Sequence, residues 1–387
     1  DCKSIRAPDM DQFSDFTDGI DRTISTTLAL VRMMSKMLRD ENIGPYIVPI
    51  IPDEARTFGM DGLFSQAGIY SPDGQNYEPV DAGTISPYKE AKDGQILQEG
   101  ICEAGALASF MAAGTAYSHF QLPMIPIYIF YSIFGMQRVG DMVWACGDAM
   151  TKGFLIGGTA GRTTLNGEGV QHQDGHSHVL ASIVPNMMTY DPAFAYELAV
   201  IMQDGIKRMY QDKEDIFYYI TVYNENHTHP AMPDDSREGI LNGMYCFKEA
   251  SESLIKKFKG KPIHLLGSGS LMQEVIEAQE TLEGEGIPTY IWSVTSYNLL
   301  HRDYRDSKNS EKKSYIESIL EDHDGHFLSV SDWVTLLPDS ISHLFPGGLT
   351  TLGTDGYGLS ETREALRDHF GISVKSIVKK AKGLLSN

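Results

Sequence analysis

Apolar side chains recur at helical spacing from Ile24 to Leu38, which predicts a first helix after a polar, unpatterned stretch of residues 1–20. Beyond it, short continuous apolar runs alternate with longer helical segments. Strands are predicted at 46–52, 124–132, 154–159, 183–188 and 216–223, and helices at 101–117, 136–149 and 193–210. Strands that are apolar along their whole length are typical of a parallel sheet covered on both faces by helices.

A polar, charged and proline-containing stretch, NENHTHPAMPDDSREG, begins at Asn224 and is typical of a linker. After it, PIHLLGSGS, a helical segment at 271–282 and TYIWSV predict a βαβ unit. HFLSVSD, TTLGTDG and two helical segments follow. The sequence therefore predicts an α/β protein with an N-terminal extension (1–20), a parallel-sheet domain (21–225), a linker (226–260) and a smaller α/β domain (261–387).

Composition narrows the class of protein. A chain of 387 residues exceeds what one core usually supports, which agrees with two domains. The net charge of -20 disfavours nucleic acid and anionic membrane surfaces as partners. Four scattered cysteines without CxxC spacing suit reduced thiols, and no apolar run reaches the roughly 18 residues of a membrane span. We expect a soluble, cytoplasmic protein. Because the chain begins with Asp1 rather than Met, we also expect a processed product or a fragment.

Three segments could carry chemistry. HQDGHSH places His172, Asp174, His176 and His178 within seven positions, which suits a metal site. Without an HExxH helix, we favour hydrogen-bonding or substrate roles. Upstream, GGTAGRTTLNGEGVQ surrounds Glu168 with five glycines and is equally compatible with an active-site loop and an ordered surface loop. GSGS at 267–270 lacks GxGxxG and the Walker lysine, which favours a tight turn.

Three acidic residues stand out by position. Asp53 and Glu54 directly follow a predicted strand, and Glu103 lies near the start of an otherwise apolar helix. Carboxylates after strands of a parallel sheet face the crevice in which α/β proteins bind ligands. For Glu103 the alternative is an acid favoured by the helix macrodipole alone.

Six segments together carry a family resemblance: ISTTLALVRMM, VPIIPDEARTFGMDGLF, GQILQEGICEAGA, PMIPIYIFYSIFGMQRVGD, GFLIGGTAGRTTLNGEGVQHQDGHSH and LGTDGYGLSETREALRDHF. From about Ile24 to nearly the C-terminus, the chain resembles the homodimeric type of pyruvate dehydrogenase decarboxylating component. The resemblance implies a transketolase-like fold with three α/β domains. Residues 21–225 would be the thiamin diphosphate pyrimidine-binding domain, and residues 261–387 the C-terminal domain.

The diphosphate-binding domain of this superfamily carries a GDG signature and a later asparagine that complete a Mg²⁺ site. No GDG occurs in this sequence, in which Gly140-Asp141 and Gly147-Asp148 are followed by Met and Ala. We therefore expect the Mg²⁺ and diphosphate ligands to come from another domain or subunit, and the chain alone to be inactive. The resemblance leaves open a fragment of a longer chain and one subunit of a split enzyme.

The resemblance also implies residue roles. Glu103 would hydrogen-bond the ring nitrogen of the coenzyme's aminopyrimidine and act as the catalytic carboxyl group. Tyr131, Phe134 and Ile101 would pack against the coenzyme. Asp53 and Glu54 would line the site, whereas Glu168 and His172 would move protons or orient substrate.

The implied reaction is decarboxylation of pyruvate, followed by acetyl transfer to lipoyl groups of a dihydrolipoyl acyltransferase. The C-terminal domain would be non-catalytic and contribute contacts in a homo-oligomer. The alternatives are another 2-oxoacid dehydrogenase or a transketolase-like half subunit, a non-catalytic scaffold, and, least favoured, a metal hydrolase using HQDGHSH.

Overall fold

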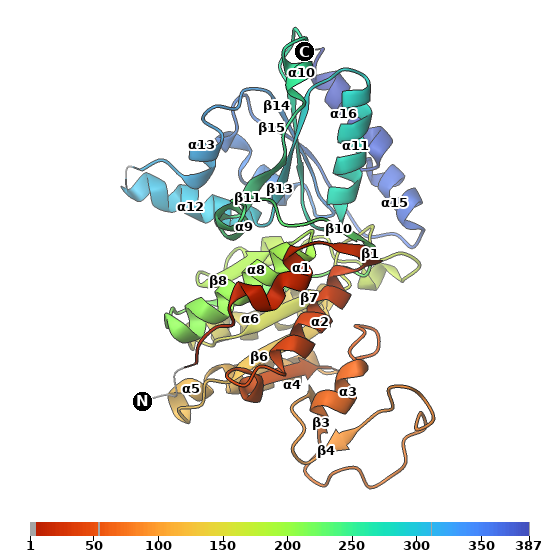
Figure 1. The fold of residues 1–387 in the computed structure, drawn as a ribbon, viewed down its shortest axis with the longest axis vertical. Helices are drawn as coiled ribbons and strands as arrows, with labels where there is room; N and C mark the ends of the chain where they lie inside the picture. The colour runs from red at the N-terminus through yellow and green to blue at the C-terminus, as the bar shows by residue number, and fades with distance from the viewer. Residues whose placement is uncertain (1–4, 53–54, 311, 387) are drawn as a thin grey trace.

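The computed structural model describes residues 5–52, 55–310 and 312–386, which form two α/β units stacked along the long axis of the molecule (Figure 1). The first unit holds a six-stranded sheet of order β5-β2-β6-β7-β9-β8, and every neighbouring pair is parallel. Its strands are β2 (Ile47–Ile51), β5 (Leu97–Gln98), β6 (Ile125–Tyr131), β7 (Phe154–Gly158), β8 (Met187–Tyr190) and β9 (Phe217–Thr221). All residues of β2, β7 and β9 are buried, which explains their continuous apolar runs.

Helices connect and cover these strands. The longer ones are α2 (Thr26–Met37), α4 (Glu103–Gly114), α6 (Met136–Asp148) and α8 (Ala195–Ile206), and the shorter ones are α1 (Ser14–Thr17), α3 (Gly62–Ala67), α5 (Ala116–His119) and α7 (Ser177–Ala181). Helix α2 begins where the Ser25 hydroxyl accepts a hydrogen bond from the Leu28 amide at 3.1 Å. Almost every residue of α8 is buried: α8 contacts α1 and α2, and its Gly205 lies against Phe154 and Tyr218 of the sheet.

The second unit has a five-stranded mixed sheet of order β11-β13-β12-β14-β15, in which only β11 is antiparallel to its neighbour. Its strands are β11 (Met244–Lys248), β12 (Ile263–Gly267), β13 (Thr289–Val294), β14 (His326–Val330) and β15 (Leu349–Leu352). Its helices are α9 (Arg237–Asn242), α10 (Glu252–Ile255), α11 (Met272–Gly284), α12 (Tyr297–Ser310), α13 (Tyr315–Ile319), α14 (Leu336–Asp339), α15 (Arg363–Phe370) and α16 (Val374–Leu384). The predicted α/β class, with a parallel-sheet unit followed by a smaller one, is confirmed.

Several elements differ from the sequence prediction. The stretch predicted as a linker contains β10 (His227–His229), α9, β11 and α10, and β10 pairs antiparallel with β1 (Ile20–Ile24). The strand predicted from residue 183 begins only at Met187, because Pro185 cannot donate to a sheet ladder. The long helix predicted to residue 210 changes at Lys207 into a π-helical turn. A small parallel pair, β3 (Ile69–Tyr70) and β4 (Glu90–Ala91), lies beside α3 at the far end of the first unit (Figure 1).

A buried carboxylate joins the two units. Asp191, just after β8, accepts a hydrogen bond from the Thr221 hydroxyl at 2.6 Å and one from the Trp333 indole at 2.8 Å. The Tyr223 hydroxyl also donates to it. Because Trp333 belongs to the second unit and the other two donors to the first, this side chain fixes the two units relative to each other.

Within the part of the chain that the structure describes, no helix is long and apolar enough to span a bilayer.

Candidate active site

Glu103 is the first residue of α4, which follows β5 at the carboxyl end of the first sheet. The Cys102 side chain caps this helix by accepting from the Gly105 amide. The Glu103 side chain is largely buried, since the residue is 9% exposed, and its Oε1 accepts a hydrogen bond from Arg138 Nη1 at 2.8 Å. The helix macrodipole and the guanidinium both favour a negative charge at this point.

An aromatic pair lies on the other side of Arg138. Tyr131 is the last residue of β6, and Phe134 belongs to the single turn that follows it, with ring centroids 6.0 Å apart. The guanidinium of Arg138 lies over the Phe134 ring at 3.8 Å, a cation–π contact. Phe58 packs against Tyr131 from behind at 5.6 Å. Arg138 therefore connects the carboxylate of Glu103 with the aromatic pair.

His172 and Glu168 complete this group. His172 Nδ1 is 3.1 Å from Glu168 Oε2, and a carboxylate can only accept, so Nδ1 carries the proton of this hydrogen bond. The imidazole stacks on Tyr131 at 5.4 Å and meets the edge of Phe134 at 5.6 Å. This orientation leaves Nε2 as the nitrogen that can accept or release a proton.

The rest of HQDGHSH points elsewhere. Asp174 is fully buried and accepts from the amides of His176 at 3.0 Å and Ser177 at 3.1 Å, at the start of α7. His178 is 2.9 Å from the Thr221 hydroxyl, and burial lowers the pKa of this histidine. His176 faces Gln137 at 2.7 Å. His176 Nδ1 also lies 3.9 Å from Asp174 Oδ1, but His172 and His178 have other partners. No group of three or more potential metal ligands occurs among the described residues.

Five of the residues singled out from sequence come together: Glu103, Tyr131, Phe134, Glu168 and His172. Ile101, two positions before Glu103, is 72% exposed. Asp53 and Glu54 lie outside the described residues.

Sequence reasoning missed Arg138. This residue lies in the first turn of α6, four positions after Phe134 and 35 positions from Glu103. The cationic residue in MQRVGD was the available signal, because a helix turn that follows a strand end points toward the same crevice as the strand end itself.

The group can bind a flat, nitrogen-containing ring. Tyr131 and Phe134 are half-buried and present aromatic faces, and Glu103 is a poorly solvated carboxylate that can hydrogen-bond a ring nitrogen. This combination of aromatic faces and a carboxylate fits an aminopyrimidine. They do not fit a diphosphate-bound Mg²⁺, because such a metal requires several oxygen ligands and the described residues hold no suitable cluster.

The chain matches two family models. Residues 5–230 match the pyruvate dehydrogenase E1 component middle domain, and residues 243–373 match the transketolase-like TK C-terminal domain. The chain is 49% identical to the pyruvate dehydrogenase E1 component of Pseudomonas aeruginosa, over 99% of this chain and 44% of that protein. It is 46% identical to the corresponding protein of Escherichia coli K12, with the same coverage. The chain therefore spans less than half the length of these curated relatives.

Solved structures show the same fold at low identity. Transketolase from Campylobacter jejuni superimposes with a TM-score of 0.69 at 17% identity, over 99% of this chain and 48% of that one. A split-gene transketolase, solved as an inactive β4 tetramer, gives a TM-score of 0.62 at 16% identity, over 94% of this chain and 98% of that one. The fold is therefore transketolase-like.

Proposed function

Because the chain belongs to the family of pyruvate dehydrogenase E1 components, we propose that it supplies the catalytic-glutamate half of a thiamin diphosphate-dependent enzyme that oxidatively decarboxylates pyruvate. The observation that carries this proposal is the convergence of Glu103, the Tyr131–Phe134 pair and His172 at one edge of the first sheet. A flat nitrogen heterocycle needs such a combination of carboxylate and aromatic faces. A scaffold protein has no use for it.

Each candidate site residue has a distinct task in this proposal. Thiamin diphosphate, when bound, supplies the carbon nucleophile and electron sink that pyruvate decarboxylation requires. Glu103 would hydrogen-bond the pyrimidine ring nitrogen and hold a proton there, where it could assist proton transfer by the bound coenzyme. Tyr131 and Phe134 orient the ring by stacking, and the exposed Ile101 adds an apolar contact. Asp53 and Glu54 are proposed to line the same site.

Glu168 and His172 act on the substrate side. The hydrogen bond from His172 Nδ1 to Glu168 fixes the ring, so that Nε2 holds or moves a proton at the substrate oxygen. The same nitrogen suits the second half-reaction, in which the acetyl unit is transferred to a lipoyl group of a dihydrolipoyl acyltransferase. Reductive transfer to a dithiolane requires a proton at the departing sulfur, and an imidazole can deliver it near neutral pH.

The remaining coenzyme ligands, those for the diphosphate and Mg²⁺, are proposed to come from outside this chain. We propose that residues 21–225 are the pyrimidine-binding domain and that residues 261–387 form the C-terminal domain, to which the connecting stretch 226–260 contributes the edge strand β11. We further propose that a diphosphate-binding domain holds the diphosphate and Mg²⁺. That domain belongs to the rest of the same polypeptide or to a separate subunit. The assembled enzyme is a cytoplasmic homo-oligomer on this proposal. The coverage of 44% in the curated relatives supports a missing part of this kind.

The test is pyruvate turnover with an artificial electron acceptor, thiamin diphosphate and Mg²⁺, measured for this chain alone and for the chain combined with the diphosphate-binding part. The proposal expects activity only in the combination. Activity of the chain alone would contradict the claim that metal and diphosphate ligands lie elsewhere. Turnover of a different 2-oxoacid or a ketose phosphate in place of pyruvate would support a related enzyme instead. No turnover in a folded, associated mixture would favour a scaffold.

A further inference from the structure

The loop between β7 and α7 carries both Glu168 and His172, and its first half is buried against the second unit. Residues 159–164 are all buried, whereas residues 165–172 are intermediate or exposed. The loop is therefore clamped at one end and presents its functional side chains at the other.

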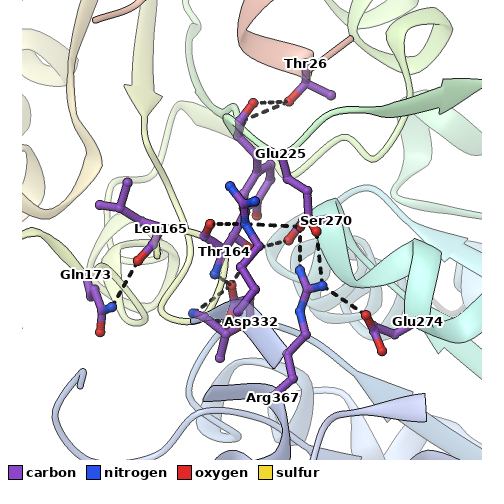
Figure 2. A network of polar contacts seen from close by, with 12 residues as sticks. Thr26, Thr164, Leu165, Gln173, Glu225, Ser270, Glu274, Asp332 and Arg367 are labelled. Carbon is purple, nitrogen blue, oxygen red and sulfur yellow. Dashed lines mark hydrogen bonds and ion pairs between the residues drawn. The ribbon is translucent and has the colours of Figure 1, made fainter. Parts of the chain in front are cut away.

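Asp332, the second residue after β14, holds the clamped end (Figure 2). This aspartate is 1% exposed. Its Oδ1 accepts from the Thr163 amide at 2.9 Å, and its Oδ2 accepts from the Thr164 amide at 3.0 Å and the Thr164 hydroxyl at 2.7 Å. At Gly161 the backbone has φ +89°, and a Cβ would lie 2.4 Å from Asp332 Oδ2. The loop thus approaches the carboxylate too closely for any side chain at that position.

Asp332 contacts the loop at the carboxyl ends of the central strands of the second sheet. In this sheet β12 lies between β13 and β14, so the chain adds its next strand on one side of β12 and a later strand on the other. The strand order therefore reverses between β12 and β14, and Asp332 follows the carboxyl end of β14 at this point. In open α/β sheets this crevice is where ligands bind. Here the backbone of Thr163 and Thr164 occupies it, and the Thr164 hydroxyl also contacts that of Ser270 at the carboxyl end of β12. The second unit binds a segment of the first where such sheets bind a small molecule.

Further contacts extend from Asp332 toward the functional residues. The Arg363 guanidinium donates to the Thr164 carbonyl at 2.6 Å, and the Gly167 amide donates to the Glu361 carbonyl at 3.2 Å, one residue before Glu168. We propose that Asp332 is a positioning residue, which anchors the loop so that Glu168 and His172 stay in register with Glu103. The C-terminal unit then sets the geometry of the catalytic centre in addition to any contacts between subunits.

This inference rests on the proposed function of His172. The test therefore separates the anchoring role of Asp332 from the catalytic role of His172. The variant is Asp332→Asn in the complete enzyme, assembled with its diphosphate-binding part. An amide of the same shape has only one accepting atom, so at least one loop donor would face an NH₂ group. The matched control is Asp339→Asn in the same unit, where the amide oxygen can still accept the hydrogen bond that the Thr351 hydroxyl donates at 2.8 Å.

The first readout is amide hydrogen exchange, which does not depend on activity. In Asp332→Asn we expect exchange across residues 163–172 to accelerate about 10-fold, with β12 unchanged, because a hydrogen bond to a charged group is lost. Asp339→Asn should leave this loop unchanged. Unaltered exchange of the loop amides in folded Asp332→Asn would overturn the proposal.

The second readout is a double-mutant cycle with His172→Ala. Alone, Asp332→Asn should lower kcat by roughly 10- to 100-fold with little change in KM, because a small displacement of a catalytic group is costly. In the His172→Ala background most of that loss should disappear, because the positioned group is absent. A full, additive loss would show a general structural effect and refute positioning. If His172→Ala itself leaves turnover unchanged, the proposed role of His172 fails, and the exchange data still decide whether Asp332 anchors the loop.

Two more conservative variants test the same contact in case Asp332→Asn does not fold. Thr164→Val keeps the side-chain shape but removes the hydroxyl that donates to Asp332, and Thr164→Ser retains it. We expect Thr164→Val to show part of the Asp332→Asn effect on hydrogen exchange and kcat. Thr164→Ser should keep both quantities close to those of the parent enzyme. Equal behaviour of the two variants would contradict the anchoring role.

Discussion

Arg367 of α15 ties the two units together through a buried ion-pair network, and its removal gives a quantitative test of the interface (Figure 2). Its guanidinium is 2.9 Å from Glu274 Oε1 on α11 and also pairs with Glu225, just beyond β9 of the first unit. Arg367 is only 6% exposed, and the two carboxylates are also mostly shielded from solvent. The variant Arg367→Met keeps most of the side-chain volume. It leaves Glu274 without its cationic partner, and it leaves Glu225 with only the weaker pair to Arg363 at 3.9 Å.

The cost follows from the burial. Removing one partner of a buried ion pair usually destabilises a protein by about 3–5 kcal/mol, and we expect the lower end because both carboxylates retain some contact with water. Burial already raises the pKa of Glu274, and Arg367 opposes that rise. Without Arg367 the pKa of Glu274 in the folded state rises further. The folded variant then takes up a proton on Glu274 at pH values at which this residue is still ionised in the unfolded chain. The free-energy deficit of the variant is therefore largest near pH 7 and shrinks as the pH falls toward 5.

Urea unfolding of the parent chain and Arg367→Met at pH 7 and pH 5 measures both quantities. The matched control is Lys382→Met, which removes an exposed pair with Glu285 at 2.6 Å and should cost less than about 1 kcal/mol. A deficit for Arg367→Met as small as that of the control, or one that grows as the pH falls, would refute the reasoning.

Other perturbations have equally definite outcomes. In the assembled enzyme, Glu103→Gln should slow pyruvate decarboxylation by roughly 10²- to 10⁴-fold, whereas the exposed Glu41→Gln should not; equal rates would remove Glu103 from catalysis. Burial lowers the pKa of His264 from 6.5 to about 4, so the unfolded chain protonates first and stability falls as pH drops through this window. Urea midpoints at pH 7.5 and 5 should therefore differ less for His264→Phe than for the parent. Trp333→Phe removes the donor to Asp191 and should cost about 1.5–3 kcal/mol in urea unfolding; an unchanged midpoint would show that this buried bond contributes nothing.

Much of the fold could be predicted because its central strands are buried on both faces. Strands β2, β6, β9 and β12 are short apolar runs of the predicted extent, and each is flanked by turn or helix signals. Strand β11 was missed because it follows a polar, proline-containing stretch and pairs antiparallel at a sheet edge, where one side of a strand is open. Local composition carries no information about such a pairing with β13.

The candidate site was accessible mainly through the family resemblance, which the family models confirm. Pattern alone left Glu103 indistinguishable from a helix-terminal acid, and it left the glycine-rich loop open between two interpretations. Arg138 was missed because its partner Glu103 is 35 positions away, and Asp332 because it lies 168 positions from Thr164. Contacts at such separations follow from sheet topology and have no local signature in the sequence.

We propose that Glu103 of this chain promotes proton transfer at thiamin diphosphate held partly by another domain. Exchange of the thiazolium C2 proton of the coenzyme with deuterium from D₂O, followed by proton NMR after rapid quenching, measures this transfer without turnover. In the assembled enzyme we predict exchange faster than in free coenzyme, and a loss of roughly 10²-fold or more in Glu103→Gln with the coenzyme still bound. Equally fast exchange in parent and variant, at equal coenzyme occupancy, would contradict this role of Glu103.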